Sequence, residues 1–158
     1  ISLEGACHTA VTVLEDGFTV HSIGTTLSRT VSAGYVEGTA INLERSLALG
    51  GRLDGHLVQG HVDGVGELVA ISEEGEYRLC DFRLPSDITA QTILHGSIAI
   101  NGVSLTVNAL LEPDVCQVGV IPFTWDHTNL GGLGVGDAVN VEADMIGKYV
   151  RRMLPEGE

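Results

Sequence analysis

The residues best suited to chemistry lie in a glycine-rich stretch near the middle of the chain. Residues 55–64 read Gly-His-Leu-Val-Gln-Gly-His-Val-Asp-Gly, which places two histidines among four glycines. An imidazole titrates near neutral pH, so His61 could act as a general base. In a glycine-rich turn it could equally be a structural group that bonds a backbone carbonyl. His56, five residues earlier, points differently on an extended chain, and we expect it to serve structure.

Two further positions combine nucleophilic and polar side chains. Ser104 and Thr106 are two residues apart, so on a strand both project to the same face. Two hydroxyls on one face can bind the carbonyl and ring nitrogens of a flat heterocycle, although such a pair often reflects β propensity alone. Cys7 and Thr9 show the same spacing near the start of the chain. A free cysteine is commonly a small buried hydrophobe, and that alternative stays open for Cys7.

The chain contains an internal repeat that relates these two pairs. Residues 1–10 align with residues 98–107, and residues 41–44 align with residues 139–142. The agreement extends over roughly 45 residues and includes matched glycines, which makes chance a poor explanation. In this alignment Cys7 corresponds to Ser104, and Thr9 corresponds to Thr106.

Each copy has the pattern of short antiparallel strands. Asn101-Gly102 is a tight-hairpin pair that separates two apolar-rich strands at residues 98–100 and 104–107. Further strands are predicted at residues 65–71, 77–84, 115–121 and 138–142, with turn residues between them. Many short strands with regular turns favour a small barrel or sandwich. The first copy lacks an equivalent of residues 57–96, so we expect about forty residues before residue 1 and an incomplete first barrel.

Two segments are predicted to be helical. Residues 86–94 follow Pro85 and begin with a Ser-Asp capping signal, and residues 144–154 have an amphipathic pattern that ends before Pro155. A terminal amphipathic helix attached to a barrel must cover an apolar surface, and a partner subunit is a reasonable candidate.

Composition excludes several classes of protein. The formal net charge of −13 argues against nucleic acid and anionic membranes as partners, because phosphate contacts need clustered Lys and Arg. The apolar runs are too short to span a bilayer. Three cysteines without a Cys-x-x-Cys spacing indicate neither a disulfide framework nor a zinc ribbon, which favours a reducing cytoplasm.

The motifs together resemble riboflavin synthase. The resemblance rests on four stretches in the expected order: residues 55–64, residues 101–107, Thr-Asn-Leu-Gly at 128–131 and Val-Asn-Val-Glu at 139–142. It covers the whole chain and includes the internal duplication of that family. Departures from the family pattern are concentrated in the first copy.

The resemblance implies an all-β fold of two tandem six-stranded antiparallel Greek-key barrels, here with the first one incomplete, followed by a C-terminal α-helix. The implied domains are residues 1–55, the second half of the N-terminal lumazine-binding barrel; residues 56–143, the C-terminal barrel; and residues 144–158, a trimerisation helix and tail. It also implies a homotrimer whose active sites lie between subunits.

The implied activity is that of a transferase without metal or organic cofactor. Two molecules of 6,7-dimethyl-8-ribityllumazine undergo dismutation, in which four carbons pass from one to the other to give riboflavin and 5-amino-6-(ribitylamino)uracil. By resemblance Cys7 and His61 are catalytic. The implied substrate-binding residues are Thr9, Ile23, His95, Ser97, Ser104, Thr106, Ile121 and Asp144. Asp144 could equally be the N-cap of the last helix.

Three other functions are compatible with parts of the pattern. A non-catalytic lumazine- or flavin-binding paralogue would have the same fold, but would not need the cysteine and histidine. A metal site built from Cys7, His8, His56 and His61 is disfavoured, because adjacent strand residues face opposite sides. A purely structural β module would not need matched polar faces in both copies.

Overall fold

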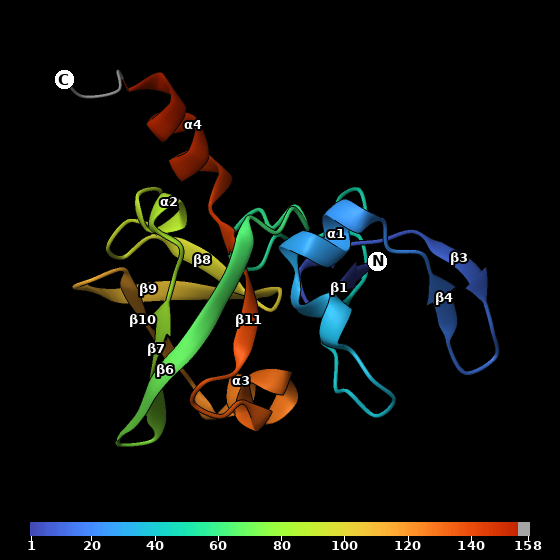
Figure 1. The fold of residues 1–158 in the computed structure, drawn as a ribbon, viewed down its shortest axis with the longest axis horizontal. Coiled ribbons are helices and arrows are strands. Elements are labelled where there is room, and N and C mark those ends of the chain that lie inside the picture. Colours follow the sequence, from blue (N-terminus) through green and yellow to red (C-terminus); the bar gives the residue numbers. More distant parts are fainter. Residues whose placement is uncertain (155–158) are drawn as a thin grey trace.

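The computed structural model describes residues 1–154. The second copy forms a closed six-stranded barrel in the order β10-β7-β6-β11-β8-β9, with every neighbouring pair antiparallel. Its strands are β6 (Gly64–Glu74), β7 (Tyr77–Arg83), β8 (Ser97–Ile100), β9 (Val103–Leu111), β10 (Val115–Val120) and β11 (Ala138–Ala143). All strands predicted for this copy are confirmed, and Figure 1 shows them wrapped around one interior.

Alternate side chains of these strands fill the barrel. Ile98, Ile100 and Val107 are fully buried, and the core also includes Phe82 and Val141. Because successive strand residues face opposite sides, the remaining positions of β8 and β9 lie on the outside of the barrel. Ser97 pairs with Thr106, and Ala99 pairs with Ser104, on that outer face. The predicted shared face of Ser104 and Thr106 is therefore present.

The first copy has the same order of elements without a closed barrel in the described residues. Strands β1 (Ser2–Leu3), β2 (Ala6–Cys7) and β5 (Leu43–Glu44) form one sheet, and β3 (Ala10–Val13) and β4 (Phe18–Val20) form a hairpin. Helix α1 (Gly24–Arg29) and the 3-10 helix η1 (Val31–Gly34) precede β5. Helix α3 (Pro122–His127) and the 3-10 helix η2 (Asn129–Gly132) occupy the same place before β11.

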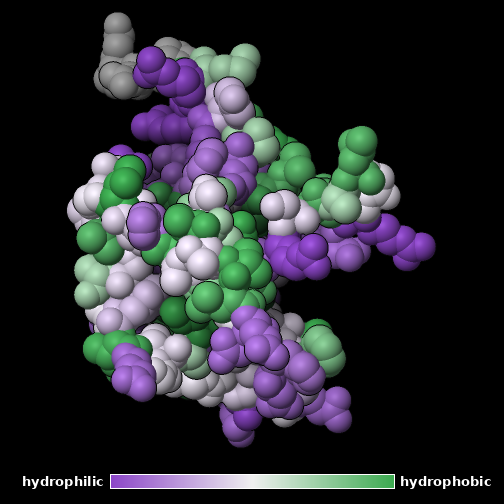
Figure 2. Space-filling view, turned by 90° about the vertical axis from the view of Figure 1, so that its right-hand side faces the viewer, coloured by the Kyte–Doolittle hydropathy of each residue, from purple (hydrophilic) through white to green (hydrophobic). Residues whose placement is uncertain are grey.

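The first copy exposes many apolar side chains. Val11, Val13, Leu14 and Ile23 are each more than half exposed, and green surface is spread over the face that this copy presents in Figure 2. The strands of the two copies have similar apolar content. The apolar side chains of the first copy are therefore more exposed because they do not pack into a closed barrel as those of the second copy do.

The two copies meet at their tight turns. Gly5 (φ 78°) and Gly102 (φ 79°) lie back to back, so that a Cβ on Gly102 would lie 2.6 Å from the backbone nitrogen of Gly5. A Cβ on Gly5 would lie 2.8 Å from the nitrogen of Gly102. Only glycine fits on either side, because the positive φ and the close approach both exclude a side chain.

Asparagine side chains cross this junction in both directions. Asn140 Nδ2 donates to the carbonyl of Glu4 (2.9 Å), and Asn42 Nδ2 donates to the carbonyl of Asn101 (3.1 Å). Asn42 and Asn140 are equivalent in the repeat. The contacts therefore have an approximate two-fold relation, and the duplication is visible in the packing as well as in the element order.

The two predicted helices have different outcomes. Helix α4 (Met145–Met153) is confirmed, and its N-cap Asp144 accepts a hydrogen bond from the backbone nitrogen of Ile146 (3.0 Å). The predicted helix over residues 86–94 is wrong in length, since α2 spans only Ser86–Thr89. Beyond Ala90 the backbone makes turns instead, with Gln91 N bonded to the carbonyl of Ile88 and Thr92 N to that of Thr89. The side chains of Gln91 and Thr92 donate to the carbonyls of Asp87 and Ile88, which the backbone of a longer helix would have bonded.

Helix α4 extends away from the barrel (Figure 1), and Ile146, Tyr149, Val150 and Met153 are at least half exposed on it. The tail predicted after residue 154 lies outside the described residues. Among the helices of residues 1–154, none has the length and apolar content needed to cross a membrane.

Candidate functional site

An open cavity of about 740 Å³ lies where the two copies meet residues 55–61, which join them and are called the linking segment below. It is bounded by the β1–β2 turn, the start of β9, the linking segment and the end of α3. The reactive and polar side chains in this lining include Cys7, Asp54, His56, Ser104, His127 and Thr128, and Glu44, Arg45 and Arg52 are further charged groups there. The cavity therefore unites Cys7 and Ser104, the repeat-related pair that the sequence singled out.

Cys7 is the exposed cysteine of the chain. Cys80 and Cys116 are buried in the second barrel. Burial raises the pKa of Cys80 to about 11 and the pKa of Cys116 to about 12, and the carboxylate of Asp81 adds to both shifts. A buried, protonated thiol is a poor nucleophile, so Cys7 is the cysteine suited to covalent chemistry.

The linking segment lies directly against both members of the pair. The backbone nitrogen of Cys7 donates to the carbonyl of Gly60 (2.9 Å), and a Cβ on Gly60 would lie 2.8 Å from Cys7 Cβ. At the other end, a Cβ on Gly55 would collide with Ser104 Oγ. Glycines at 55 and 60 (φ 87° and 79°) are thus required for the segment to follow the cavity wall.

His56 contacts the second member of the pair. Its Nδ1 lies 2.7 Å from Ser104 Oγ, within hydrogen-bonding distance. Burial lowers the pKa of His56, although the carboxylates of Asp144 and Glu142 act in the opposite direction. The expectation that His56 serves structure did not include a contact with a candidate substrate-binding residue, and no local pattern could have revealed one.

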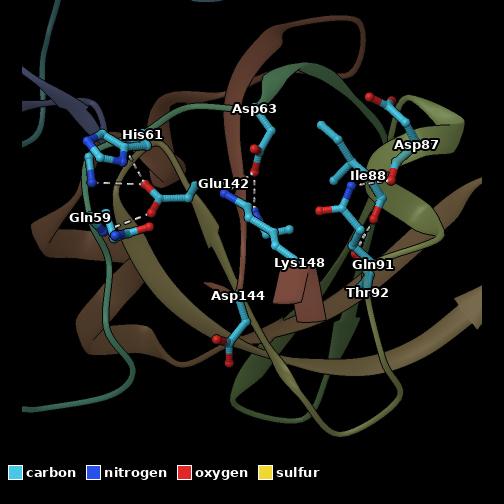
Figure 3. Close-up of polar contacts among 12 residues, drawn as sticks. Gln59, His61, Asp63, Asp87, Ile88, Gln91, Thr92, Glu142, Asp144 and Lys148 are labelled. Carbon is cyan, nitrogen blue, oxygen red and sulfur yellow. Dashed lines mark hydrogen bonds and ion pairs between the residues drawn. The ribbon is translucent and has the colours of Figure 1, made fainter. Parts of the chain in front are cut away.

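His61 lies at the other end of the linking segment and is exposed. Glu142 holds this end: its carboxylate accepts hydrogen bonds from the backbone nitrogens of Gln59 (2.8 Å), Gly60 (3.0 Å) and His61 (3.0 Å). Figure 3 shows these contacts converging on Glu142, which is almost fully buried. The His61 imidazole does not line the cavity that contains Cys7.

Asp63 fixes the chain immediately after His61. Its Oδ2 accepts a hydrogen bond from the backbone nitrogen of Ala143 (2.8 Å) and pairs with Lys148 Nζ at 2.7 Å (Figure 3). These two contacts of Asp63 stabilise the junction between β11 and α4. Neither Glu142 nor Asp63 was singled out from the sequence, because their roles depend on contacts distant in the chain.

The other candidates lie outside the cavity lining. Ser97 and Thr106 share the outer face of β8 and β9 with Ser104, and His95 precedes this face as an exposed residue. Ile23 and Ile121 are the N-caps of α1 and α3, with similar extended backbones and 69% and 58% exposure. Thr9 is exposed between β2 and β3. Asp144 caps α4.

These positions therefore form two similar sets, one per copy. Each set has a nucleophilic or polar residue on a strand, a threonine two residues later, and an isoleucine at a helix N-cap. Within one chain the sets share the cavity only through Cys7 and Ser104.

The geometry does not favour the metal-site alternative. His8 Nδ1 lies 2.9 Å from the carbonyl of Ala6, and its Nε2 lies 2.9 Å from Ser22 Oγ, so both ring nitrogens have partners. Across residues 1–154, no cluster of three or more His, Cys, Asp or Glu side chains is arranged to hold a metal ion.

Comparison with known proteins identifies the fold and the family. The family model described as "Lumazine binding domain" matches twice, at residues 1–46 and 59–144. Riboflavin synthase of Mycobacterium tuberculosis is 41% identical over 157 residues, which is 98% of this chain and 78% of that protein. Riboflavin synthase of Bacillus subtilis is 38% identical over 154 residues, or 98% and 71% of the two chains. The chain belongs to the riboflavin synthase family.

Solved structures of LumP agree with this assignment of fold. LumP complexed with 6,7-dimethyl-8-(1'-D-ribityl)lumazine gives a TM-score of 0.79, and LumP complexed with riboflavin gives 0.81. Both are 26% identical to this chain and cover 90% of it and 76% of their own length. The all-β fold with a closed antiparallel barrel is thereby confirmed, and the two family-model matches fit the tandem arrangement.

Proposed function

We propose that this protein is a riboflavin synthase that binds 6,7-dimethyl-8-ribityllumazine and transfers four carbons from one molecule to a second. The products are riboflavin and 5-amino-6-(ribitylamino)uracil. The observation that carries the proposal is the double match to the lumazine-binding model, at 1–46 and 59–144, in a chain that is 41% identical to a riboflavin synthase. Two matched copies fit a reaction that consumes two identical substrates.

The roles follow from the chemistry of the side chains. The reaction needs a proton removed from a methyl group and a nucleophile added to a ring carbon. We assign nucleophilic addition to Cys7, the exposed thiol, and proton abstraction to His61. Two molecules of one substrate contain all the atoms of the two products, so the reaction requires no cofactor.

Substrate binding is assigned to the two repeat-related sets. Ser104, Thr106 and Ser97 would bind polar atoms of the ring and the ribityl chain on the outer face of β8 and β9, with His95 and Asp144 at its borders. Ile121 would pack against the ring. Thr9 and Ile23 would act in the same way beside Cys7.

Assembly into a homotrimer would complete these sites. His61 does not line the cavity of its own chain, and an exposed imidazole can reach the site of a neighbouring subunit. Helix α4 offers the contact, since its apolar residues Ile146 and Val150 are 66% and 51% exposed. Replacing both with Asp should dissociate the trimer, because unpaired buried charge is costly. Sedimentation of the double variant as an intact trimer would contradict the assignment.

The division into residues 1–55, 56–143 and 144–158 accompanies this proposal as two lumazine-binding barrels and a trimerisation segment. The boundaries of the two family-model matches support the first two units. Three free cysteines fit a reducing compartment, and we propose the cytoplasm.

A non-catalytic lumazine carrier is the second candidate, supported by the similarity to LumP. The two functions are separated by incubating the full chain with the lumazine and following riboflavin by chromatography. Wild-type protein should form riboflavin, and Cys7→Ser should bind lumazine with little turnover. Lumazine binding without riboflavin from the wild-type protein would identify a carrier.

A further inference from the structure

The end of α3 brings a polar side chain to the cavity that neither of the two repeat-related sets includes. His127 is the last residue of α3, and it lines the same cavity as Cys7 and Ser104. We infer that His127 is a further substrate-binding residue, whose Nε2 accepts a hydrogen bond from a hydroxyl of the ribityl chain. This inference rests on the proposed function and adds a residue to the second copy's set.

Phe123, one helical turn earlier, holds the His127 imidazole in one orientation. The Nδ1 atom of His127 lies 2.8 Å from the carbonyl oxygen of Phe123, and the two rings stack with centroids 4.0 Å apart and planes 15° apart. Phe123 is 67% exposed, so this aromatic pair lies at the surface and not in the barrel core. A side chain that is already oriented loses less entropy when a ligand binds to it.

The contact with Phe123 determines which nitrogen of the ring can accept a hydrogen bond. A backbone carbonyl only accepts, so Nδ1 carries the proton that it donates to Phe123. In the neutral imidazole Nε2 is then an acceptor, and within residues 1–154 it makes no hydrogen bond. An acceptor beside the cavity suits a ligand rich in hydroxyl donors, and the ribityl chain is the part of the lumazine with that chemistry.

The neighbouring Thr128 also lines the cavity, but its hydroxyl serves the local turn. It donates to the carbonyl of Thr124 (2.7 Å) and accepts from the backbone nitrogen of Leu130 (3.3 Å). Both contacts hold the chain between α3 and η2. We therefore assign Thr128 to structure, and His127 to the ligand.

The first copy does not repeat this arrangement. The alignment that pairs residues 41–44 with residues 139–142 makes Arg29 equivalent to His127 and Thr25 equivalent to Phe123. A guanidinium only donates, and a threonine offers no ring for stacking. Arg29 is also outside the cavity lining. An acceptor at this place is thus specific to the second copy, and it would distinguish the two bound lumazines.

The test is a fluorescence titration of the full chain with two compounds, 6,7-dimethyl-8-ribityllumazine and 6,7,8-trimethyllumazine. The second compound has a methyl group in place of the ribityl chain. His127→Ala should weaken binding of the ribityl compound about fivefold, the value of one hydrogen bond, and leave binding of the trimethyl compound unchanged. A loss confined to the ribityl compound identifies that chain as the group that His127 contacts.

Two further substitutions separate the acceptor from the mere presence of a polar side chain. His127→Gln should bind the ribityl compound within about twofold of wild type, because its amide oxygen can reach near the position of Nε2. His127→Asn has a shorter side chain and should resemble His127→Ala. Asp126→Ala is the matched control, since Asp126 is an exposed neighbour on α3 outside the cavity lining, and it should bind both compounds as wild type does.

Kinetics of the same variants show whether His127 acts in binding alone. His127→Ala should raise KM for the lumazine about fivefold with kcat nearly unchanged, because the ribityl chain does not react. Urea unfolding of each variant checks that the barrel is intact.

Three results would overturn the inference: equal weakening of both compounds, unchanged binding of the ribityl compound by His127→Ala, or failure of His127→Gln to retain binding. Each of them leaves the lumazine site in place as long as the wild-type protein binds lumazine. Wild-type protein that binds neither compound would overturn the proposed function as well.

Discussion

The turns at Glu4-Gly5 and Asn101-Gly102 have nearly the same backbone and different side chains. Glu4 and Asn101 both have φ 48°, and the glycines that follow have φ 78° and 79°. Asn101 uses its side-chain oxygen to accept a hydrogen bond from the backbone nitrogen of Asn140 (2.8 Å). Glu4 makes the equivalent contact with Asn42 at 3.4 Å, but does so with a carboxylate that is 3% exposed.

Burial raises the pKa of the Glu4 carboxyl, although hydrogen bonds from Asn42, Tyr35 and Asn129 act in the opposite direction. Burial also raises the pKa of Tyr35, and the nearby Glu4 adds to that shift. The two turns therefore have the same backbone, because Gly5 and Gly102 must lie in contact at the junction. The side chains beside these glycines are free to differ in charge. The same holds for Cys7 and Ser104, which share a position and differ in reactivity.

The largest contrast between the copies should appear in thiol reactivity. Iodoacetamide at pH 8 should label Cys7 and leave Cys80 and Cys116 unmodified, since a thiol with a pKa of about 12 is ionised to only about one part in 10⁴ at that pH. Peptide mass spectrometry measures the labelled fraction. Labelling of all three in urea is the control, and native labelling of Cys116 at the rate of Cys7 would contradict the barrel packing.

Making the first copy resemble the second should remove most of the catalysis. Cys7→Ser should lower the single-turnover rate by on the order of a hundredfold, or about 2.7 kcal/mol, because a hydroxyl is a far weaker nucleophile than a thiol. Lumazine affinity, measured by fluorescence titration, should change little. Full turnover by this variant would show that Cys7 is a packing residue.

The junction between the copies should be sensitive to a single methyl group. Gly102→Ala should lower the free energy of unfolding by about 2 kcal/mol more than Gly136→Ala, because the backbone of Gly5 must move to admit the Cβ. Gly136 is the matched control: its φ is 100° and a Cβ there would meet nothing within 4 Å, so only the strain of about 1–2 kcal/mol remains. Urea unfolding measures both, and equal losses would contradict the close contact.

Making the two turns identical should have the smallest effect on the free energy of unfolding, and it should raise this free energy whereas Gly102→Ala lowers it. Glu4→Asn should raise the free energy of unfolding at pH 8 by about 1 kcal/mol, since Asn tolerates positive φ and carries no charge to bury.

The effect of this substitution should depend on pH. With a raised pKa in the folded state, Glu4 contributes most to stability below its ordinary value of 4.5, and that contribution is lost as the pH rises through the raised pKa. The gain should therefore shrink near pH 4. Glu4→Gln removes the charge and keeps the side-chain length, so it isolates the effect of the charge on stability. If urea unfolding shows that the stability gained by Glu4→Asn and by Glu4→Gln does not depend on pH, Glu4 is not a buried carboxylate.

Much of the second barrel could be predicted from the sequence. Alternating residues such as Ile98, Ile100, Leu105 and Val107 report burial directly, because a strand has a two-residue period and one face must be apolar. Asn101-Gly102 located a hairpin, and the repeat paired Cys7 with Ser104 before any contact was known. Helix α4 was also predicted correctly, since its amphipathic pattern and its cap are local.

Tertiary structure decided the contacts that shape the candidate site. His56 and Ser104 are 48 residues apart, and Gln59 and Glu142 are 83 apart. No periodicity connects such residues, because their meeting depends on barrel closure and on two glycine turns that touch. The sequence by itself determined the strands, the repeat and the types of reactive residue. Only the tertiary structure decided which imidazole lies beside Ser104 and which carboxylate binds the linking segment. These contacts depend on packing between distant parts of the chain, and a local sequence pattern describes each part by itself.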